Sequence, residues 1–405
     1  MRILHTSDWH LGKKLERFSR LEEQISVMEE ICDIANSEET DAIIVAGDVF
    51  DTFNPPVEAV ELFYRTLRKL SNNGKRPVVV IAGNHDSADR IEAPDPLARE
   101  LGIIFVGYPN SKINTFELDS GLKLINSDKG FLEFLLPNSE LLRILTTPYA
   151  NEQRLRSFLG VEDSEDELRN ILEENWKETA EKYCDSKGVN ILTAHLFFTK
   201  KGSKIQNEPD DEKPILHIGG AQAIYSNSIP KEIQYTALGH LHRKQIVDDT
   251  VSPVVYCGTP IAYSFGESNQ DKFVAVLDIK ANEKAIINFV ELKNGKKLLR
   301  KVFNDLEVAR EWLTENKNAL VEITLEMDNF MTADEKKSLF DIHDGIVNII
   351  PKINKKDGDT DSESKSINIQ DDLPSLFKKY FSSKNGGQEP NEELMELFNE
   401  VISKN

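Results

Sequence analysis

Cysteine and long apolar runs are both scarce in this chain of 405 residues. Cys32, Cys184 and Cys257 lie far apart and form no Cys-x-x-Cys pair, so neither a disulfide framework nor a thiolate zinc site is expected. The longest fully apolar runs, such as Val78 to Ala82, have about a quarter of the roughly 20 residues that a membrane span needs. The start MRILHTSDW also lacks the apolar region of a signal peptide. We therefore predict a protein of the reducing cytoplasm that neither spans a membrane nor is exported.

Positive charge is in short supply as well. The 49 Lys and Arg residues face 69 Asp and Glu residues, which gives a net charge of −20. Because Lys and Arg neutralise the phosphates of DNA, this balance predicts weak, salt-sensitive DNA binding by the chain alone. The phosphate-binding pattern Gly-x-x-x-x-Gly-Lys-Ser/Thr is absent, so no ATP is expected to bind through that device.

Short apolar runs alternate with amphipathic stretches over the first hundred residues. The runs Arg2 to Thr6, Asp41 to Ala46 and Pro77 to Ala82 are typical of strands, and residues 21–35 and 60–70 have helical periodicity. This βαβ repetition predicts a parallel sheet covered by helices. Later runs up to residue 279 extend it into a large mixed sheet, so residues 1–284 form the predicted main domain of an α/β (α+β) protein.

The pattern changes near residue 285. Strands around Ile286–Leu292 and Leu320–Met327, with two helices, predict a small α+β capping domain over residues 285–351. Residues 352–371 are polar and charged and predict a flexible linker. Residues 372–405 then carry two helical apolar stripes, which either dock back on the main domain or bind a partner. The stripes consist of Leu373, Leu376, Phe377, Tyr380, Phe381, Leu394, Leu397, Phe398 and Val401.

Polar residues follow the predicted strands at the point where each strand ends. They are Asp8, His10, Asp48, Asn84, His85, His195, His240 and His242. Ligand sites of α/β sheets lie at the carboxyl ends of the strands, so these side chains are expected to converge. The mixture of carboxylate, imidazole and amide suits Mn²⁺, Fe²⁺ or Zn²⁺. Without His85, these residues are seven candidate metal ligands. If one carboxylate bridges two metal ions, each ion receives four protein donors, and such a two-metal site predicts phosphoester hydrolysis.

These motifs occur in a familiar order. Asp-x-His, Gly-Asp-x-x-Asp, Gly-Asn-His-Asp, a lone His and Gly-His-x-His resemble the calcineurin-like metallophosphoesterase superfamily. The resemblance implies a two-sheet βαβ sandwich that binds two Mn²⁺ ions, with Mg²⁺ or Fe²⁺ as alternatives. It assigns Asp8, His10, Asp48 and His242 to one ion and Asp48, Asn84, His195 and His240 to the other. It also implies that His85 protonates the leaving oxygen. Some relatives have a histidine where this chain has Asp51, and Asp51 is expected instead to orient a metal ligand.

Within the superfamily, the opening segment, the block Gly-Asp-Val-Phe-Asp-Thr and the phrase Tyr256 to Pro260 are similar to nuclease subunits that process DNA ends. This resemblance implies double-strand 3′ to 5′ exonuclease and single-strand or hairpin endonuclease activity in replication, recombination and repair. It further implies a homodimer within a heterotetramer, whose ABC-type ATPase partner supplies the ATP dependence and receives the C-terminal helices.

Basic residues form two clusters that are candidates for DNA contact. They are Lys200, Lys201 and Lys204 in one, and Lys296, Lys297 and Arg300 in the other, although each cluster also fits a solvated loop. His5, His217 and His343 are expected to be structural. Two further functions stay open: a phosphatase acting on a protein or small phosphoester, and a DNA-end-binding subunit without catalysis.

Overall fold

The computed structural model describes residues 1–149, 165–202, 223–268, 270–327, 331–353 and 373–384, together with 390, 394, 395 and 398. The chain divides into two units, each described by itself below. The first comprises Met1–Glu326 and Met331–Lys352, and the second comprises Met327–Phe330 and Ile353–Asn405. Among the helices of the described residues, none has the length and apolarity to cross a membrane.

A six-stranded sheet carries the first three sequence motifs. Its strand order is β18-β17-β1-β4-β5-β6. The parallel strands are β1 (Arg2–Thr6), β4 (Ala42–Ala46), β5 (Val78–Ile81) and β6 (Ile103–Val106), and the antiparallel strands are β17 (Lys272–Asp278) and β18 (Ile286–Leu292). All residues of β4 and β5 are buried, as expected for parallel strands that are covered on both faces.

An eight-stranded sheet carries the remaining motifs. The single large sheet expected from the strand pattern is therefore wrong, and the two-sheet sandwich implied by the family resemblance is confirmed. Its order is β15 (Gln245–Asp248), β16 (Val254–Tyr256), β14 (Tyr235–Gly239), β11 (Val189–His195), β10 (Leu141–Thr147), β9 (Phe131–Leu135), β8 (Lys123–Asp128) and β7 (Phe116–Glu117). The two sheets pack through a shared core to which Ile44, Ile81, Ile144 and Ile191 belong. Strand pattern alone does not separate the sheets, because strands of both are apolar on both faces.

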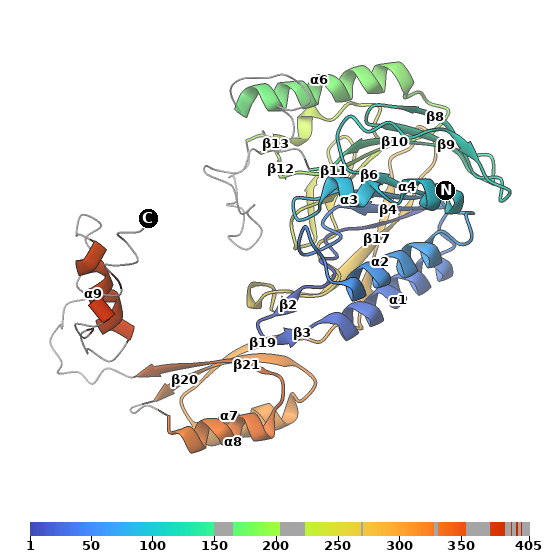
Figure 1. Cartoon of the computed structure of the whole chain (residues 1–405). Coiled ribbons are helices and arrows are strands. Elements are labelled where there is room, and N and C mark those ends of the chain that lie inside the picture. The colour runs from blue at the N-terminus through green and yellow to red at the C-terminus, as the bar shows by residue number, and fades with distance from the viewer. Residues whose placement is uncertain are drawn as a thin grey trace. The chain divides into compact units, whose positions relative to one another are not determined.

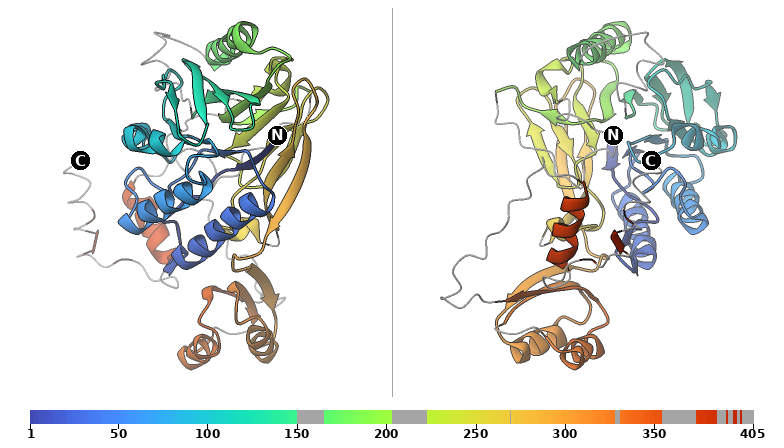
Figure 2. Two further views of the ribbon diagram at one scale, coloured as in Figure 1. Left: turned by 90° about the vertical axis from the view of Figure 1, so that its right-hand side faces the viewer. Right: turned by 60° about the vertical axis from the view of Figure 1, so that its left-hand side comes forward.

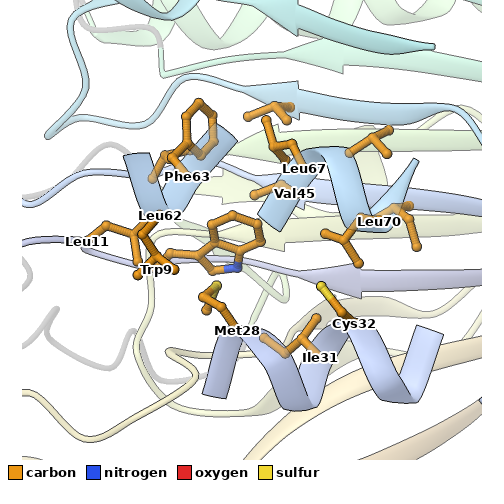
Figure 3. Close-up of a cluster of buried hydrophobic side chains, with 14 of the residues drawn as sticks. Trp9, Leu11, Met28, Ile31, Cys32, Val45, Leu62, Phe63, Leu67 and Leu70 are labelled. Atoms are coloured by element: carbon orange, nitrogen blue, oxygen red, sulfur yellow. The ribbon is translucent and has the colours of Figure 1, made fainter. Parts of the chain in front are cut away.

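Helices cover the outer faces of this sandwich. Helices α1 (Leu21–Ser37) and α2 (Val57–Leu70) pack on the six-stranded sheet, and α6 (Glu165–Tyr183) packs on the eight-stranded sheet through Leu172 and Trp176 (Figures 1 and 2). Figure 3 shows the ring of Trp9 between Met28 of α1 and Leu62 of α2. Trp9 is fully buried, so the segment after β1 is anchored in the core between two candidate ligands.

Short elements complete the sandwich. They are β2 (Lys14–Leu15), β3 (Phe18–Ser19), β12 (Phe198–Thr199), β13 (Ile224–Tyr225), α3 (Ala88–Glu92), α4 (Asp95–Ala98) and the 3₁₀ turns η1 (Arg99–Leu101), η2 (Ser226–Ser228) and η3 (Phe265–Glu267). The β2–β3 hairpin follows the loop after β1. The η3 turn lies directly before β17.

The small α+β part begins later than predicted. Strand β18, which was expected in the capping domain, pairs instead with β17, because the two are joined as a hairpin. The three-stranded sheet consists of β19 (Leu298–Phe303), β20 (Leu320–Met327) and β21 (Ile346–Ile353), with α7 (Leu306–Glu315) and α8 (Ala333–Ile342). It packs on the β2–β3 hairpin through Leu15, Leu298 and Leu320.

The second unit contains α9 (Leu373–Lys384). The ring of Phe377 stacks on that of Phe398 with centroids 4.0 Å apart, so the two predicted apolar stripes touch each other. Leu397, Val401 and residues 354–372, which make up most of the predicted linker, lie outside the described residues.

Candidate metal centre

The carboxyl ends of five strands from the two sheets meet at one edge of the sandwich. Strands β1, β4 and β5 are parallel neighbours in one sheet, and β11 and β14 are parallel neighbours in the other. Two hydrogen bonds join the sheets there. The Nδ1 atom of His195 lies 2.8 Å from the carbonyl oxygen of Ala46, and the backbone N–H of His240 donates to Oδ1 of Asp8 at 2.9 Å. The structure therefore brings the predicted strand-end residues together.

Asp48 lies between two groups of ligand atoms. Its Oδ2 atom is 3.3 Å from Nε2 of His195 and 3.8 Å from Nε2 of His10. Its Oδ1 atom accepts a hydrogen bond from the backbone N–H of His85 at 2.8 Å. Burial alone would raise the pKa of the Asp48 carboxyl, but His195, His85 and His10 together hold that pKa well below its ordinary value. Asp48 is thus an ionised carboxylate with the position that a bridging ligand requires.

One group of ligand atoms contains Asp8, His10, Asp48 and His242. Ligand atoms of Asp8, His10 and Asp48 all lie within 4.8 Å of one another. The Nε2 atoms of His10 and His242 are 3.1 Å apart, so the two imidazoles point at the same place. The Nδ1 atom of His10 is buried without a hydrogen-bond partner among the described residues. Burial holds the pKa of His10 well below its ordinary value, which keeps the ring neutral and able to bind a metal ion.

The other group contains Asp48, Asn84, His195 and His240. The Oδ1 atom of Asn84 lies 2.9 Å from Nε2 of His195 and 3.0 Å from Nδ1 of His240. Because a carbonyl oxygen only accepts hydrogen bonds, Ala46 requires the proton of a neutral His195 to be on Nδ1. The Nε2 lone pair of His195 then faces the oxygens of Asn84 and Asp48.

Nε2 of His195, Oδ1 of Asn84 and Oδ2 of Asp48 are three lone-pair atoms that face one another, so a cation is needed between them. In the chain without metal a proton can serve: burial by itself lowers the pKa of His195, but Asp48, Asp8 and the Ala46 carbonyl together raise this pKa to about 9. A divalent ion in place of that proton would be coordinated by Nε2 of His195, Oδ1 of Asn84 and Oδ2 of Asp48 at once. Carboxylate, imidazole and amide donors suit Mn²⁺, Fe²⁺ or Zn²⁺, so the residues fit a pair of such ions.

The backbone of this centre is in unusual conformations. Asp8, His10, Asp48 and His240 have positive φ angles of 53°, 44°, 46° and 111°, which residues other than glycine rarely adopt. Glycine is needed where strands approach closely, because a Cβ atom at Gly239 would lie 1.8 Å from the carbonyl oxygen of Ala46. Backbone strain of this kind clusters at functional sites.

His85 lies beside this centre and is half-buried. Its ring is 4.9 Å from that of His10, and its Nδ1 atom lies 2.8 Å from the backbone carbonyl oxygen of Asp51. This carbonyl holds a proton on Nδ1, so Nε2 is the nitrogen left for exchange with a substrate. The Asp51 carboxylate accepts a hydrogen bond from Lys13 at 2.9 Å and lies 3.7 Å from Nδ1 of His10. Asp51 therefore orients His85 through its backbone and faces His10 through its side chain.

Three supporting residues did not emerge from the sequence. The Asp86 carboxylate accepts hydrogen bonds from the backbone N–H groups of Gly83, Val49 and Phe50 at 2.8, 3.1 and 3.0 Å, which ties the loops after β4 and β5 together. Burial and the nearby Asp48 raise the pKa of Asp86 to about 6. Gln24 of α1 donates to the carbonyl oxygen of His10 at 2.9 Å. Glu267 lies behind His242. Only Asp86 had a sequence signal, as the residue that follows His85.

Other sequence candidates lie outside this centre. Lys200 pairs with Asp248 at 2.9 Å and Arg300 with Glu322 at 2.6 Å, while Lys201, Lys296 and Lys297 are exposed. Lys204 and His217 lie outside the described residues. His5 contacts the carbonyl oxygen of Leu238 at 3.2 Å, and His343 contacts that of Asn316 at 3.0 Å, so both have structural hydrogen bonds.

A family model described as calcineurin-like phosphoesterase matches residues 1–244. Fold and site thus define a phosphoesterase of the calcineurin-like class. The SbcD component of the nuclease SbcCD from Bacillus subtilis strain 168 is 37% identical over 410 residues, which cover 100% of this chain and 98% of that protein. The SbcD proteins of Rhodobacter capsulatus and Staphylococcus epidermidis are 33% and 30% identical, over 69% and 72% of this chain and 66% and 70% of those proteins. The chain belongs to the SbcD family.

Proposed function

We propose that this chain is the nuclease subunit of a DNA-end-processing complex and hydrolyses DNA phosphodiester bonds with two Mn²⁺ ions. The observation that carries the proposal is the position of Asp48, whose Oδ2 atom lies between the His10 and His195 ligand groups. A chain that matches almost the full length of a relative named as part of a nuclease supports DNA as the substrate.

Asp8, His10, Asp48 and His242 would hold one ion. Asp48, Asn84, His195 and His240 would hold the other. Such a pair of ions supplies an activated water and neutralises the charge that develops on the phosphate. The chain keeps the imidazoles in the required tautomers through backbone contacts, such as the one from Ala46 to His195 at 2.8 Å.

His85 is the proposed general acid for the leaving 3′ oxygen. The Asp51 carbonyl holds the proton on Nδ1 at 2.8 Å, so transfer to a substrate takes place from Nε2 of the doubly protonated ring. The backbone N–H of His85 also donates a hydrogen bond to Oδ1 of Asp48 at 2.8 Å, which holds the His85 backbone next to the metal ligands. His85 is half-buried, so a phosphate at the metal centre can reach it.

The proposed assembly contains a second copy of the chain and an ABC-type ATPase of the SbcC kind, in the cytoplasm. The nuclease domain, predicted over residues 1–284, would extend through β18 to Leu292, and the remainder of 285–351 would form the DNA-contacting cap. Residues 352–371 would form a linker and 372–405 the module that binds the ATPase. The stacked rings of Phe377 and Phe398 support one joint apolar surface on that module. ATP dependence and much of the grip on DNA would come from the ATPase, since this chain has a net charge of −20.

The test is to incubate the purified chain with Mn²⁺ and end-labelled duplex DNA, beside the variants His85→Gln and Asp8→Ala. We expect the wild-type chain to degrade the DNA and both variants to lose activity, His85→Gln with Mn²⁺ binding retained. Intact DNA combined with fast turnover of a small phosphoester would establish a phosphatase instead. A chain that binds DNA ends but cleaves neither substrate would establish a non-catalytic subunit.

A further inference from the structure

Glu267 is a buried carboxylate behind the candidate ligand His242. It ends the η3 turn and is 5% exposed. Its Oε1 atom accepts hydrogen bonds from the backbone N–H groups of Tyr263 at 3.0 Å and Ser264 at 3.2 Å. Its Oε2 atom accepts hydrogen bonds from Oγ1 of Thr259 at 2.9 Å and from Nζ of Lys272. Since every one of these partners is a donor, Glu267 is present as the carboxylate.

The remaining side of this carboxylate faces His242. The Oε1 atom of Glu267 is 3.6 Å from Nδ1 of His242, while Nε2 of the same ring points at Nε2 of His10, 3.1 Å away. The backbone carbonyl of His242 is held as well, by the N–H of Thr259 at 3.1 Å and by Nζ of Lys272 at 3.2 Å. The ring therefore has one nitrogen toward a fixed carboxylate and the other toward the metal centre.

We infer that Glu267 is a positioning residue that holds His242 in the tautomer and orientation needed to bind one of the two metal ions. This inference rests on the proposed metal centre. A carboxylate behind a ligating histidine keeps the proton on the far nitrogen and makes the near one a stronger donor. The corresponding partner of His195 is the neutral carbonyl of Ala46, at 2.8 Å. One ligand histidine is thus backed by a charged carboxylate and the other by a neutral carbonyl. The affinity for the ion bound by His242 therefore depends on Glu267.

The first part of the test is to titrate Mn²⁺ into the metal-free full-length chain by calorimetry and to record the Mn²⁺ spin-resonance spectrum. The wild-type chain should bind two ions and show a spin-coupled pair. The variant Glu267→Gln keeps the shape but removes the charge, so one ion should bind about 10–100-fold more weakly while the other is unaffected. Addition of one equivalent should then give the spectrum of an isolated ion.

The matched control is Glu322→Gln, which removes a carboxylate that is similarly buried, at 7% exposure, and paired with Arg300 at 2.6 Å in the three-stranded sheet. It should bind both ions as the wild-type chain does. If Glu267→Gln does not fold, as judged by circular dichroism, Glu267→Asp decides. That variant keeps the negative charge, but its shorter side chain places the carboxylate farther from His242. The ion bound by His242 should then bind about tenfold more weakly.

The outcomes separate the two levels of the proposal. A wild-type chain that binds no Mn²⁺ would overturn the proposed metal centre itself. A wild-type chain that binds two ions, with a Glu267 variant that folds and binds both equally well, would overturn only the role of Glu267. An equal weakening of both ions would also reject it, because a general structural defect has that effect.

Discussion

The substitution Gly83→Ala places a methyl group against the proposed bridging carboxylate. The added Cβ atom would lie 2.1 Å from Oδ1 of Asp48 and 2.2 Å from its backbone nitrogen, and nonbonded contacts of this kind essentially never fall below 3.0 Å. Asp48 must therefore withdraw by about 1 Å, since carbon and oxygen atoms repel steeply at shorter range. That displacement breaks the 2.8 Å hydrogen bond from the N–H of His85.

Two opposing effects set the change in the free energy of unfolding. Overpacking of a tight site costs about 1–3 kcal/mol. The backbone at Gly83 lies outside the left-handed region, so alanine also restricts the unfolded chain and returns about 0.4–1 kcal/mol. We expect a net destabilisation of about 1–2 kcal/mol in urea unfolding. The nuclease rate should fall by about 100-fold, because a shift of 1 Å displaces the group shared by both ions.

A glycine remote from the metal centre provides the control. In Gly188→Ala the new Cβ atom would lie 3.1 Å from Cβ of Leu141, a contact that a shift of a few tenths of an ångström relieves. Its free energy of unfolding should change by less than about 1 kcal/mol, with Mn²⁺ binding unchanged. The reasoning fails if Gly83→Ala binds Mn²⁺ and cleaves DNA as the wild-type chain does, or if both variants lose metal equally.

Three further predictions concern catalysis, pH and the C-terminal helices. His85→Gln should lower the cleavage rate about 10²–10⁴-fold with unchanged Mn²⁺ affinity in calorimetry, and a parallel loss of metal would contradict its role as the acid. Although burial lowers the pKa of His195, Asp48, Asp8 and the Ala46 carbonyl together raise it to about 9, above its ordinary 6.5, so Mn²⁺ must displace a proton below pH 9. Affinity for the His195 ion should therefore rise up to about tenfold per pH unit between pH 7 and 9, and constant affinity in calorimetry across that range would refute the exchange. A chain truncated after Ile353, where β21 ends, should lose binding to the ATPase in pull-down but keep Mn²⁺ binding, whereas undiminished capture would reject the partner module.

The candidate ligands could be read from the sequence because of how parallel sheets are built. Asp8, Asp48 and Asn84 each follow a buried apolar run, and the carboxyl ends of such strands meet at one edge. Residue identity together with local order was sufficient for these positions.

The parts that sequence did not reveal depend on contacts between distant segments. The tautomer of His195 is set by the carbonyl of Ala46, which is 149 positions away and belongs to the other sheet. Glu267 reaches His242 only because the η3 turn folds behind the β14 loop, and no local pattern indicates that approach. The strand pattern likewise did not show the division into two sheets, which only the family resemblance implied. Strand β4 is apolar on both faces, and its neighbouring residues Ile43 and Ile44 pack into different cores.

The positive φ angles at Asp8, His10, Asp48 and His240 lower the stability of the folded chain at the positions that the proposed metal centre requires. Each such residue costs of the order of 1–3 kcal/mol, and glycine would relieve the strain. A laboratory selection that rewards only heat resistance of the metal-free chain does not test metal binding at these four residues, so a variant that has lost the metal centre passes it undetected. Melting temperature is thus a misleading guide to fitness for this protein, and screening for improved variants should be done with the metal present and with cleavage as the criterion.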